Sequence, residues 1–251
     1  MISRFKKFYR KEQFEPSLFS LIFNPYYFNR KSIYNGIKSN SKKLSGSLLD
    51  FGCGTKAYEK LFEVEKYIGI DLEINDGHDL PSEKIDFFYD GKKLPFKNDN
   101  FDSVFSSEVF EHVFNLKDIL LEINRVHKKN GLILITMPFV WHEHEMPNDF
   151  GRYTSSGIKN ILKNSNYEII KHIKSPSFFL STVQLFNSYI YNHLLPKNNL
   201  LRFILAPLFV FPINLVGLIL NIFLPKNDEL YINHTILAKN IKEISKKNLS
   251  L

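Results

Sequence analysis

The sequence predicts an α/β fold, in which helices cover both faces of a largely parallel β-sheet. Short apolar segments alternate with amphipathic helical segments over residues 46–173, as in chains whose parallel strands are joined by helices. The apolar segments are nearly continuous rather than alternating, which indicates strands that are buried on both faces. A chain of 251 residues that is 44% hydrophobic has enough apolar side chains for such a core.

The predicted strands and helices follow one another in a regular order. Residues 1–45 mix basic and aromatic side chains around a turn at Asn24-Pro25, and are expected to form short helices that cover the core. Strands are expected at residues 48–51, 67–71, 85–90, 101–106, 132–137, 167–173 and 231–239.

The helices expected between these strands have recognisable ends. A short helix is expected over residues 56–65. In residues 116–126 apolar side chains recur three and four residues apart, the period of an amphipathic helix. Asn130-Gly131 is expected to end that helix. Thr154 is a candidate N-cap for a helix that continues through Leu162.

An apolar segment precedes the last predicted strand. Residues 203–225 contain no charged side chain and are long enough to span a bilayer. A single crossing would place the strands at 167–173 and 231–239 on opposite sides of the membrane, although both are expected in one sheet. We therefore expect peripheral membrane contact through residues 200–225, with helices broken near Pro207 and Pro212. A buried helical lid and a dimer interface are the alternatives.

These patterns predict four parts. They are an N-terminal helical cover (1–45), a core (46–174), an apolar helical insertion (175–228), and the last strand with a tail (229–251).

Charge and cysteine content limit the partners and the compartment. The net charge of +7 permits an anionic partner without selecting one, and Lys197, Arg202 and Lys226 favour anionic lipid. Cys53 is the only cysteine, so no internal disulfide can form. The basic N-terminus is not followed by an apolar segment and is not a secretory signal. We expect a cytoplasmic protein at the inner face of the cytoplasmic membrane, and leave its oligomeric state open.

The loop at residues 50–55, Asp-Phe-Gly-Cys-Gly-Thr, carries the clearest chemical signal. Its glycines allow a sharp turn and the close approach of a ligand. The carboxylate of Asp50 suits a cationic amine and opposes a pyrophosphate. The dinucleotide fingerprint is also incomplete, because Ala57 stands where the last glycine belongs. Asp71 and Asp90 end the next two predicted strands, so three acids are expected at one crevice.

These motifs resemble the class I S-adenosylmethionine-dependent methyltransferases of the methyltransferase-11-like family. The resemblance covers roughly residues 46–173 and the last strand. It rests on five segments in the same order, at residues 48–55, 67–71, 90–96, 101–104 and 108–113. It implies a Rossmann-like seven-stranded sheet with helices on both faces, and S-adenosylmethionine as the cofactor. The chain departs from the family at residues 128–131, where Lys-Lys-Asn-Gly replaces a Lys-Pro-Gly-Gly turn.

The resemblance also implies which residues hold the cofactor. Asp50 and the backbone of the glycine loop would border the methionine moiety, and Ser106 would lie beside it. Asp71 would bind the ribose hydroxyls, and Asp90 with the Gly91 amide would lie at the adenine edge. The complete cofactor set implied in this way is Asp50, Gly52, Cys53, Gly54, Asp71, Leu72, Asp90, Gly91 and Ser106.

The methyl acceptor is expected beside the loop at residues 138–154, which follows the fifth predicted strand. Residues 144–154 resemble the His-Glu-x-Pro-x-Asp-Phe-x-Arg-Tyr-Thr segment of one branch of the family. We predict His144 as the general base or acceptor-positioning group, because an imidazole pKa lies near neutrality. The residues predicted to bind substrate are His112, Glu145, Arg152 and Tyr153.

Two alternatives remain open for this loop. Asp149, Arg152 and Tyr153 are equally compatible with a structural lock before the next helix. A metal site from residues 142–145 lacks the helical His-x-x-x-His spacing and a cysteine set, so no metal is predicted.

The sequence therefore predicts methyl transfer to a small molecule or a lipid-linked glycan intermediate, with oxygen as the methylated atom. The alternative is a membrane-associated interaction protein that keeps the fold without catalysis. No nucleic acid is expected, since residues 106–109 are Ser-Ser-Glu-Val rather than a base-flipping Asn/Asp-Pro-Pro-Tyr motif.

Overall fold

A computed structural model describes residues 2–73 and 84–242. The chain divides into two compact units. The helical unit comprises residues 1–36 and 174–233, and the sheet unit comprises residues 37–173 and 234–251. The four-part division expected from the sequence stays a prediction.

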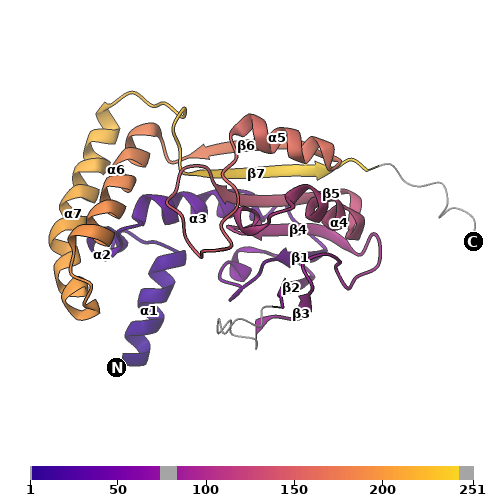
Figure 1. Ribbon diagram of the computed structural model, residues 1–251, viewed down its shortest axis with the longest axis horizontal. Coiled ribbons are helices and arrows are strands. Elements are labelled where there is room, and N and C mark those ends of the chain that lie inside the picture. Colours follow the sequence, from indigo (N-terminus) through magenta and orange to yellow (C-terminus); the bar gives the residue numbers. More distant parts are fainter. Residues whose placement is uncertain (1, 74–83, 243–251) are drawn as a thin grey trace, which may run out of the picture. The chain divides into compact units, whose positions relative to one another are not determined.

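The sheet unit is built on seven strands in the order β3-β2-β1-β4-β5-β7-β6 (Figure 1). Pairing is parallel between β3 and β2, β2 and β1, β1 and β4, and β4 and β5. Strand β7 points against its neighbours, so the sheet is mixed. The strands are β1 (Ser47–Phe51), β2 (Lys66–Leu72), β3 (Phe87–Tyr89), β4 (Phe101–Ser107), β5 (His127–Pro138), β6 (Tyr167–Ser175) and β7 (Asn233–Asn240). The predicted α/β fold and its seven strands are confirmed.

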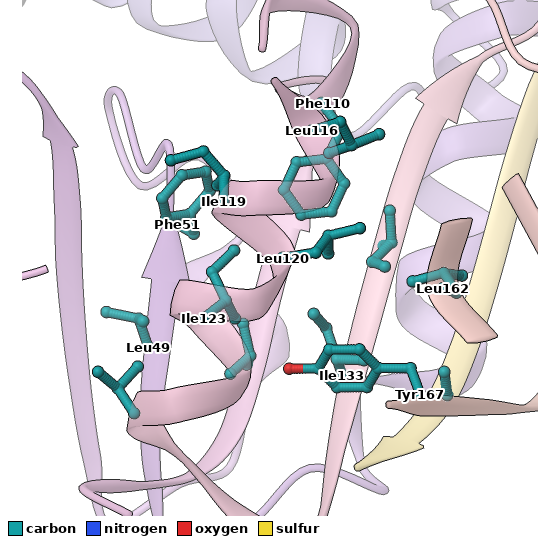
Figure 2. Packing of buried hydrophobic residues seen from close by; sticks show 14 of the residues in the cluster. Leu49, Phe51, Phe110, Leu116, Ile119, Leu120, Ile123, Ile133, Leu162 and Tyr167 are labelled. Atoms are coloured by element: carbon teal, nitrogen blue, oxygen red, sulfur yellow. The ribbon is translucent and has the colours of Figure 1, made fainter. Parts of the chain in front are cut away.

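One face of the sheet holds the main hydrophobic core. Helices α4 (Leu116–Val126) and α5 (Ser155–Asn164) contact each other and contribute to this core. Figure 2 shows Leu116, Ile119 and Leu120 from α4 directed into the cluster that contains Phe51 and Ile133. Each buried leucine or isoleucine contributes about 1.5–3 kcal/mol to stability. The helical period of the sequence therefore identified the buried face of α4.

On the opposite face, aromatic side chains of the segment after β1 pack against β4. Phe62 and Tyr58 pack against Phe105 of β4, with ring centroids 4.7 and 6.3 Å away. The helix predicted over residues 56–65 was wrong: only a 3-10 turn, η1 (Glu59–Leu61), is present. Lys56 has a left-handed backbone (φ 51°) that an α-helix cannot include.

Helix ends agree with the sequence at one site and differ at another. Thr154 caps α5 as predicted, since its Oγ1 accepts a hydrogen bond from the Gly157 amide at 3.1 Å. Helix α4 ends at Val126, four residues before the predicted Asn130 signal. His127 is already extended and pairs with Phe101 of β4, so strand pairing ended the helix early.

The helical unit contains α1 (Ile2–Phe14), α2 (Ser20–Phe23), the first part of α3 (Tyr27–Ser41), α6 (Phe178–Tyr189), a π-helical turn η4 (Ile190–Leu194) and α7 (Asn199–Phe223). Helix α7 lies beside α6 and α2 (Figure 1). It is one continuous helix with Pro207 and Pro212 inside it, so the predicted breaks were wrong. Buried Ala206, Val210 and Asn214 hold it against its neighbours, and this packing overrides the local cost of proline.

The interior of the helical unit is unusually polar. Asn187 donates to Asn214 at 2.7 Å, and Asn214 donates to the Leu21 carbonyl at 2.9 Å. Gln184 donates to the Pro25 carbonyl at 2.7 Å and accepts from the Asn29 amide at 3.1 Å. The side-chain amides of Gln184, Asn187, Asn214 and Asn29 are all buried. The helices are thus joined by hydrogen bonds as well as by apolar packing.

Its exterior is unusually apolar. Residues 201–223 of α7 form a stretch long and apolar enough to cross a bilayer, with a mean hydropathy of 2.4. The large apolar side chains exposed on α7 include Leu201, Phe203, Ile204, Leu208, Phe209, Leu215, Val216, Ile219, Leu220, Ile222 and Phe223. Phe178, Phe186 and Tyr189 of α6 are exposed as well. The helical unit therefore places amides inside and hydrocarbon outside.

Candidate functional site

The candidate site lies at the edge where the parallel strands of the sheet unit end. Because β1, β2, β4 and β5 are parallel, the loops that follow them emerge at the same edge. This edge is where ligands bind in open α/β sheets.

The glycine loop after β1 makes a tight turn toward β2. The amides of Gly52 and Cys53 both donate to the Ile70 carbonyl, at 2.9 and 3.1 Å. The Gly54 amide donates to Oδ2 of Asp71 at 2.7 Å. Gly52 and Gly54 have positive φ values of 72° and 45°, a conformation that side chains disfavour.

The two glycines differ in their surroundings, and this difference predicts distinct effects of alanine. A Cβ on Gly52 would lie 2.4 Å from Val109, whereas a Cβ on Gly54 would meet no atom within 4 Å. Gly52→Ala is expected to lower the free energy of unfolding by at least about 2 kcal/mol, through clash and strain. Gly54→Ala is expected to lose less stability but to weaken ligand binding, since its methyl group enters open space. Urea unfolding and ligand titration of both variants check this. Equal stability losses would contradict it.

Asp50 is a buried carboxyl at the end of β1. It is 3% exposed and accepts a hydrogen bond from the Tyr67 hydroxyl at 2.7 Å. Burial raises the pKa of Asp50 to about 7, and the nearby charge of Asp71 acts in the same direction. The unliganded site is therefore ready to receive a cation that would stabilise the ionised carboxylate.

This raised pKa predicts a pH dependence of stability. The folded chain holds the Asp50 proton more tightly than the unfolded chain, whose aspartate pKa is near the ordinary 3.8. The contribution is therefore present below about pH 4 and is lost as pH rises through about 7, by up to about 1.4 kcal/mol per pH unit. Urea unfolding at several pH values should show wild type losing stability relative to Asp50→Asn over this range. Parallel pH profiles would refute the assignment.

Asp71 and Asp90 end neighbouring strands but have different environments. Asp71 is largely buried and accepts hydrogen bonds from the Gly54 and Leu72 amides, at 2.7 and 2.8 Å. Burial raises the pKa of Asp71. Asp90 is exposed, and hydrogen bonds from the Lys93 and Lys92 amides to its Oδ1 lower its pKa.

The remaining predicted cofactor residues line the same edge with different roles. Gly91 has φ 80°, and a Cβ there would lie 3.2 Å from the side chain of Leu72. Ser106 is 1% exposed, and its hydroxyl has no hydrogen-bond partner within the described part of the chain. The Cys53 side chain packs against Gly69, so only the backbone of Cys53 is available to a ligand at the loop. Burial raises the pKa of the Cys53 thiol, which is therefore neutral.

The loops after β4 and β5 are tied together. The Phe150 and Gly151 amides both donate to the Glu111 carbonyl, at 2.8 and 3.0 Å. His112 Nδ1 lies 2.9 Å from the Asn148 carbonyl oxygen. The His112 and His144 rings meet edge to face, with centroids 4.9 Å apart. The sequence-predicted His112 and His144 are thus brought together.

Arg152 stabilises this loop. It donates to both carboxylate oxygens of Asp149 at 2.6 and 2.7 Å, and this aspartate is 2% exposed. The Asp149 carboxylate also accepts the His144 amide at 3.0 Å. Tyr153 is partly buried against the main core, and its carbonyl accepts a hydrogen bond from His234 at 2.8 Å. These contacts favour the lock interpretation for Arg152 and Tyr153.

Sequence reasoning missed two residues at this edge. The Tyr67 hydroxyl reaches Asp50 from the neighbouring strand β2, which pairs with β1. Glu111 is not among the predicted site residues, yet its carboxyl is fully buried without a hydrogen bond in the described residues. Neither carries a local sequence signal, since both roles depend on contacts between loops and strands.

A family model matches the part of the chain that contains this edge. The family model described as a methyltransferase domain matches residues 49–135. An uncharacterized protein of Methanocaldococcus jannaschii is 27% identical over 135 residues, which cover 54% of each chain. The chain thus spans about half the length of the curated relative it matches.

Solved structures share the fold. Phosphoethanolamine N-methyltransferase 2 of Haemonchus contortus, solved with S-adenosyl-L-methionine, is 16% identical with a TM-score of 0.56, and the match covers 94% of this chain and 57% of that one. The YcgJ protein of Bacillus subtilis is 16% identical with a TM-score of 0.51, over 85% of this chain and 99% of that one. A complex between the Haloferax volcanii Trm112 methyltransferase activator and a candidate methyltransferase gives 15% identity and a TM-score of 0.51, covering 85% and 92% of the two chains.

The domain match covers the glycine loop, Asp71, Asp90 and Ser106, and the fold match extends over most of the chain. A methyltransferase domain model thus matches residues 49–135, and the chain shares its fold with solved methyltransferase structures.

Proposed function

We propose that the chain transfers the methyl group of S-adenosylmethionine to an oxygen atom of a small or lipid-linked acceptor. The observation that carries this proposal is the pairing of Gly54 with Asp71 beside the buried Asp50. It joins an open glycine turn, an acid on the next strand and a buried carboxyl that suits a cation in one place.

The residues present fit this cofactor. The open space beside Gly54 admits a ligand, and the Ser106 hydroxyl at the same edge is buried without a described partner. Ionised Asp50 matches the ammonium group of the methionine moiety. Each Asp71 oxygen already accepts one amide and retains a lone pair for a ribose hydroxyl. Leu72 and Gly91, which lie side by side, offer an apolar surface for the adenine.

When bound, S-adenosylmethionine supplies a methyl group on a sulfonium centre as the electrophile. The chain has to align the acceptor oxygen with that methyl group and exclude water. As the new O–C bond forms, the S–C bond breaks with its electron pair on sulfur, and the acceptor hydroxyl loses its proton.

His144 is the residue we propose for activating and positioning the acceptor. Burial lowers the pKa of His144, and the neighbouring His112 acts in the same direction, so its ring is neutral at pH 7. Burial raises the pKa of Asp71, and the charge of Glu145 from the same loop as His144 acts in the same direction. We propose that Glu145 and His112 line the acceptor side with His144.

His144→Ala is expected to reduce methyl transfer at least 100-fold without changing S-adenosylmethionine affinity, which is the range typical of acid–base and positioning groups. The assay follows labelled methyl groups into a total lipid extract and into a water-soluble extract of the producing cells. Label in the lipid phase supports a lipid-linked acceptor. His142→Ala is the matched control. Unchanged turnover of His144→Ala would end the assignment.

We also propose that the helical unit attaches the enzyme to the cytoplasmic membrane at its inner face. The unit buries side-chain amides and exposes apolar side chains, whereas a unit surrounded by water shows the reverse distribution. In lipid this arrangement is favourable, since polar groups are satisfied internally and small amide contacts join the helices.

The connectivity supports contact from one side of the membrane. The chain leaves the sheet after β6 and returns to it at β7, which lies beside β6. Helix α6 has 12 residues and is about 18 Å long, too short for a hydrocarbon core of about 30 Å. A helical hairpin that lies in the interface of one leaflet satisfies both facts. Lys197 lies in the turn between the helices, Arg202 in the first turn of α7 and Lys226 after α7, where an interfacial hairpin keeps all three at anionic headgroups.

A further inference from the structure

We propose that Glu111, His112 and His144 form a binding site for a divalent transition-metal ion beside the acceptor. This inference rests on the proposed function and specifies how the acceptor hydroxyl is activated. One ligand atom from each of the three residues lies within 4.8 Å of the other two. An ion binds such ligands at roughly 2.0–2.2 Å, so small side-chain rotations are enough to close the site.

The carboxyl group of Glu111 is buried, with an exposed fraction of 0%, and neither oxygen has a hydrogen-bond partner in the described residues. His112 Nε2 lies 3.8 Å from Glu111 Oε1. A buried carboxylate without partners is costly, and a cation between it and the two imidazoles would remove that cost.

The imidazoles of His112 and His144 are oriented by contacts with neighbouring groups. His112 Nδ1 lies 2.9 Å from the Asn148 carbonyl oxygen, which places the proton on Nδ1 and leaves the Nε2 lone pair facing the cluster. His144 Nδ1 lies 3.3 Å from the His142 carbonyl, 3.3 Å from Arg152 Nη2 and 3.4 Å from Asp149. Metal-binding histidines are commonly held in this way through their second nitrogen.

A further carboxylate and a cation lie beside the three residues. Glu145 lies 3.7 Å from His112 Nε2 and is exposed, so it is available as a fourth ligand. Arg152 is the opposing cation, and its guanidinium is neutralised by the bidentate contact with Asp149.

Two imidazoles and one carboxylate suit Zn²⁺, Fe²⁺ or Mn²⁺ and leave coordination positions open. An acceptor hydroxyl bound at an open position would have a lower pKa and a fixed orientation. In that state His144 acts as a ligand, and the ion lowers the barrier to loss of the hydroxyl proton to solvent.

Calorimetry with Zn²⁺ on the full chain, freed of metal by chelation, tests the site without any assay of activity. Wild type is expected to bind one ion per chain with micromolar or tighter affinity. Glu111→Gln, His112→Ala and His144→Ala are each expected to weaken binding at least 100-fold. His142→Ala, which removes a neighbouring imidazole outside the set, should bind as wild type does. Thermal unfolding of each variant separates a lost ligand from a lost fold.

The same variants can be titrated with Mn²⁺, whose electron paramagnetic resonance signal falls on binding. Absence of saturable binding of both ions to wild type would overturn the proposal, as would wild-type affinity in all three ligand variants. Metal-independent methyl transfer would also overturn it while leaving the proposed function intact. Zn²⁺ binding without S-adenosylmethionine binding would leave the site standing and remove the proposed function.

Discussion

Asp71→Ala is expected to weaken S-adenosylmethionine binding at least 100-fold. The carboxylate holds the Gly54 amide at 2.7 Å and is the residue proposed for the ribose hydroxyls. Hydrogen bonds to a charged group are worth about 1.5–3 kcal/mol each, and about 1.4 kcal/mol corresponds to a factor of ten in affinity. Loss of two such bonds therefore gives the expected change, measured by calorimetry.

The control for this variant removes the same charge elsewhere. Asp118 lies exposed on α4, so Asp118→Asn should bind the cofactor as wild type does. Asp71→Asn should be intermediate, because one oxygen acceptor remains. If Asp71→Ala retained full affinity, the ribose assignment would be wrong.

The second large effect concerns the membrane. Ile204→Asp combined with Leu208→Asp is expected to abolish flotation with vesicles of phosphatidylethanolamine and phosphatidylglycerol. Both side chains are more than half exposed on α7, at 57% and 67%. A charge costs about 2.5–3.5 kcal/mol at the centre of a bilayer, so two carboxylates would release the chain.

The matched control places the same two charges on the sheet unit. Leu121→Asp with Ile170→Asp changes apolar side chains that are 38% and 55% exposed. This control should float with vesicles as wild type does. A wild-type chain that stays with the soluble fraction and runs as a dimer would show that a second copy covers α7 instead.

Much of the sheet unit could be predicted, because its signals are local. Strand β1 and the glycine loop are contiguous in sequence, and the period of α4 identifies its buried face directly. The acids Asp50, Asp71 and Asp90 follow from strand ends alone, since parallel strands deliver their ends to one edge.

Other features depend on contacts that the sequence does not display. The backbone of Lys56 turns left-handed, so residues 56–65 pack as isolated turns despite a helical composition. Pro207 and Pro212 were expected to break a helix that α6 and α2 hold together. Gln184 and Asn187 are polar residues of a largely apolar segment, and both face the protein interior. In each case tertiary packing outweighed local propensity.

The acceptor loop shows the same limit at the site. The sequence identified the polar residues of this loop as a group, but it did not show which hydrogen bonds and ion pairs they form. Arg152 is committed to Asp149, and Glu111 lies buried beside the two histidines. Which of these side chains meets ligand depends on how the loops after β4 and β5 pack on each other.

The central claim is that the loop at residues 50–55 and Asp71 form a sulfonium-nucleoside site. Calorimetric titration of the full chain with S-adenosylmethionine, compared with a nicotinamide dinucleotide, tests this most directly. The account predicts one molecule of S-adenosylmethionine bound per chain and no heat with the dinucleotide, whose pyrophosphate Asp50 would repel. A folded chain that binds the dinucleotide, or that binds no S-adenosylmethionine, would contradict it.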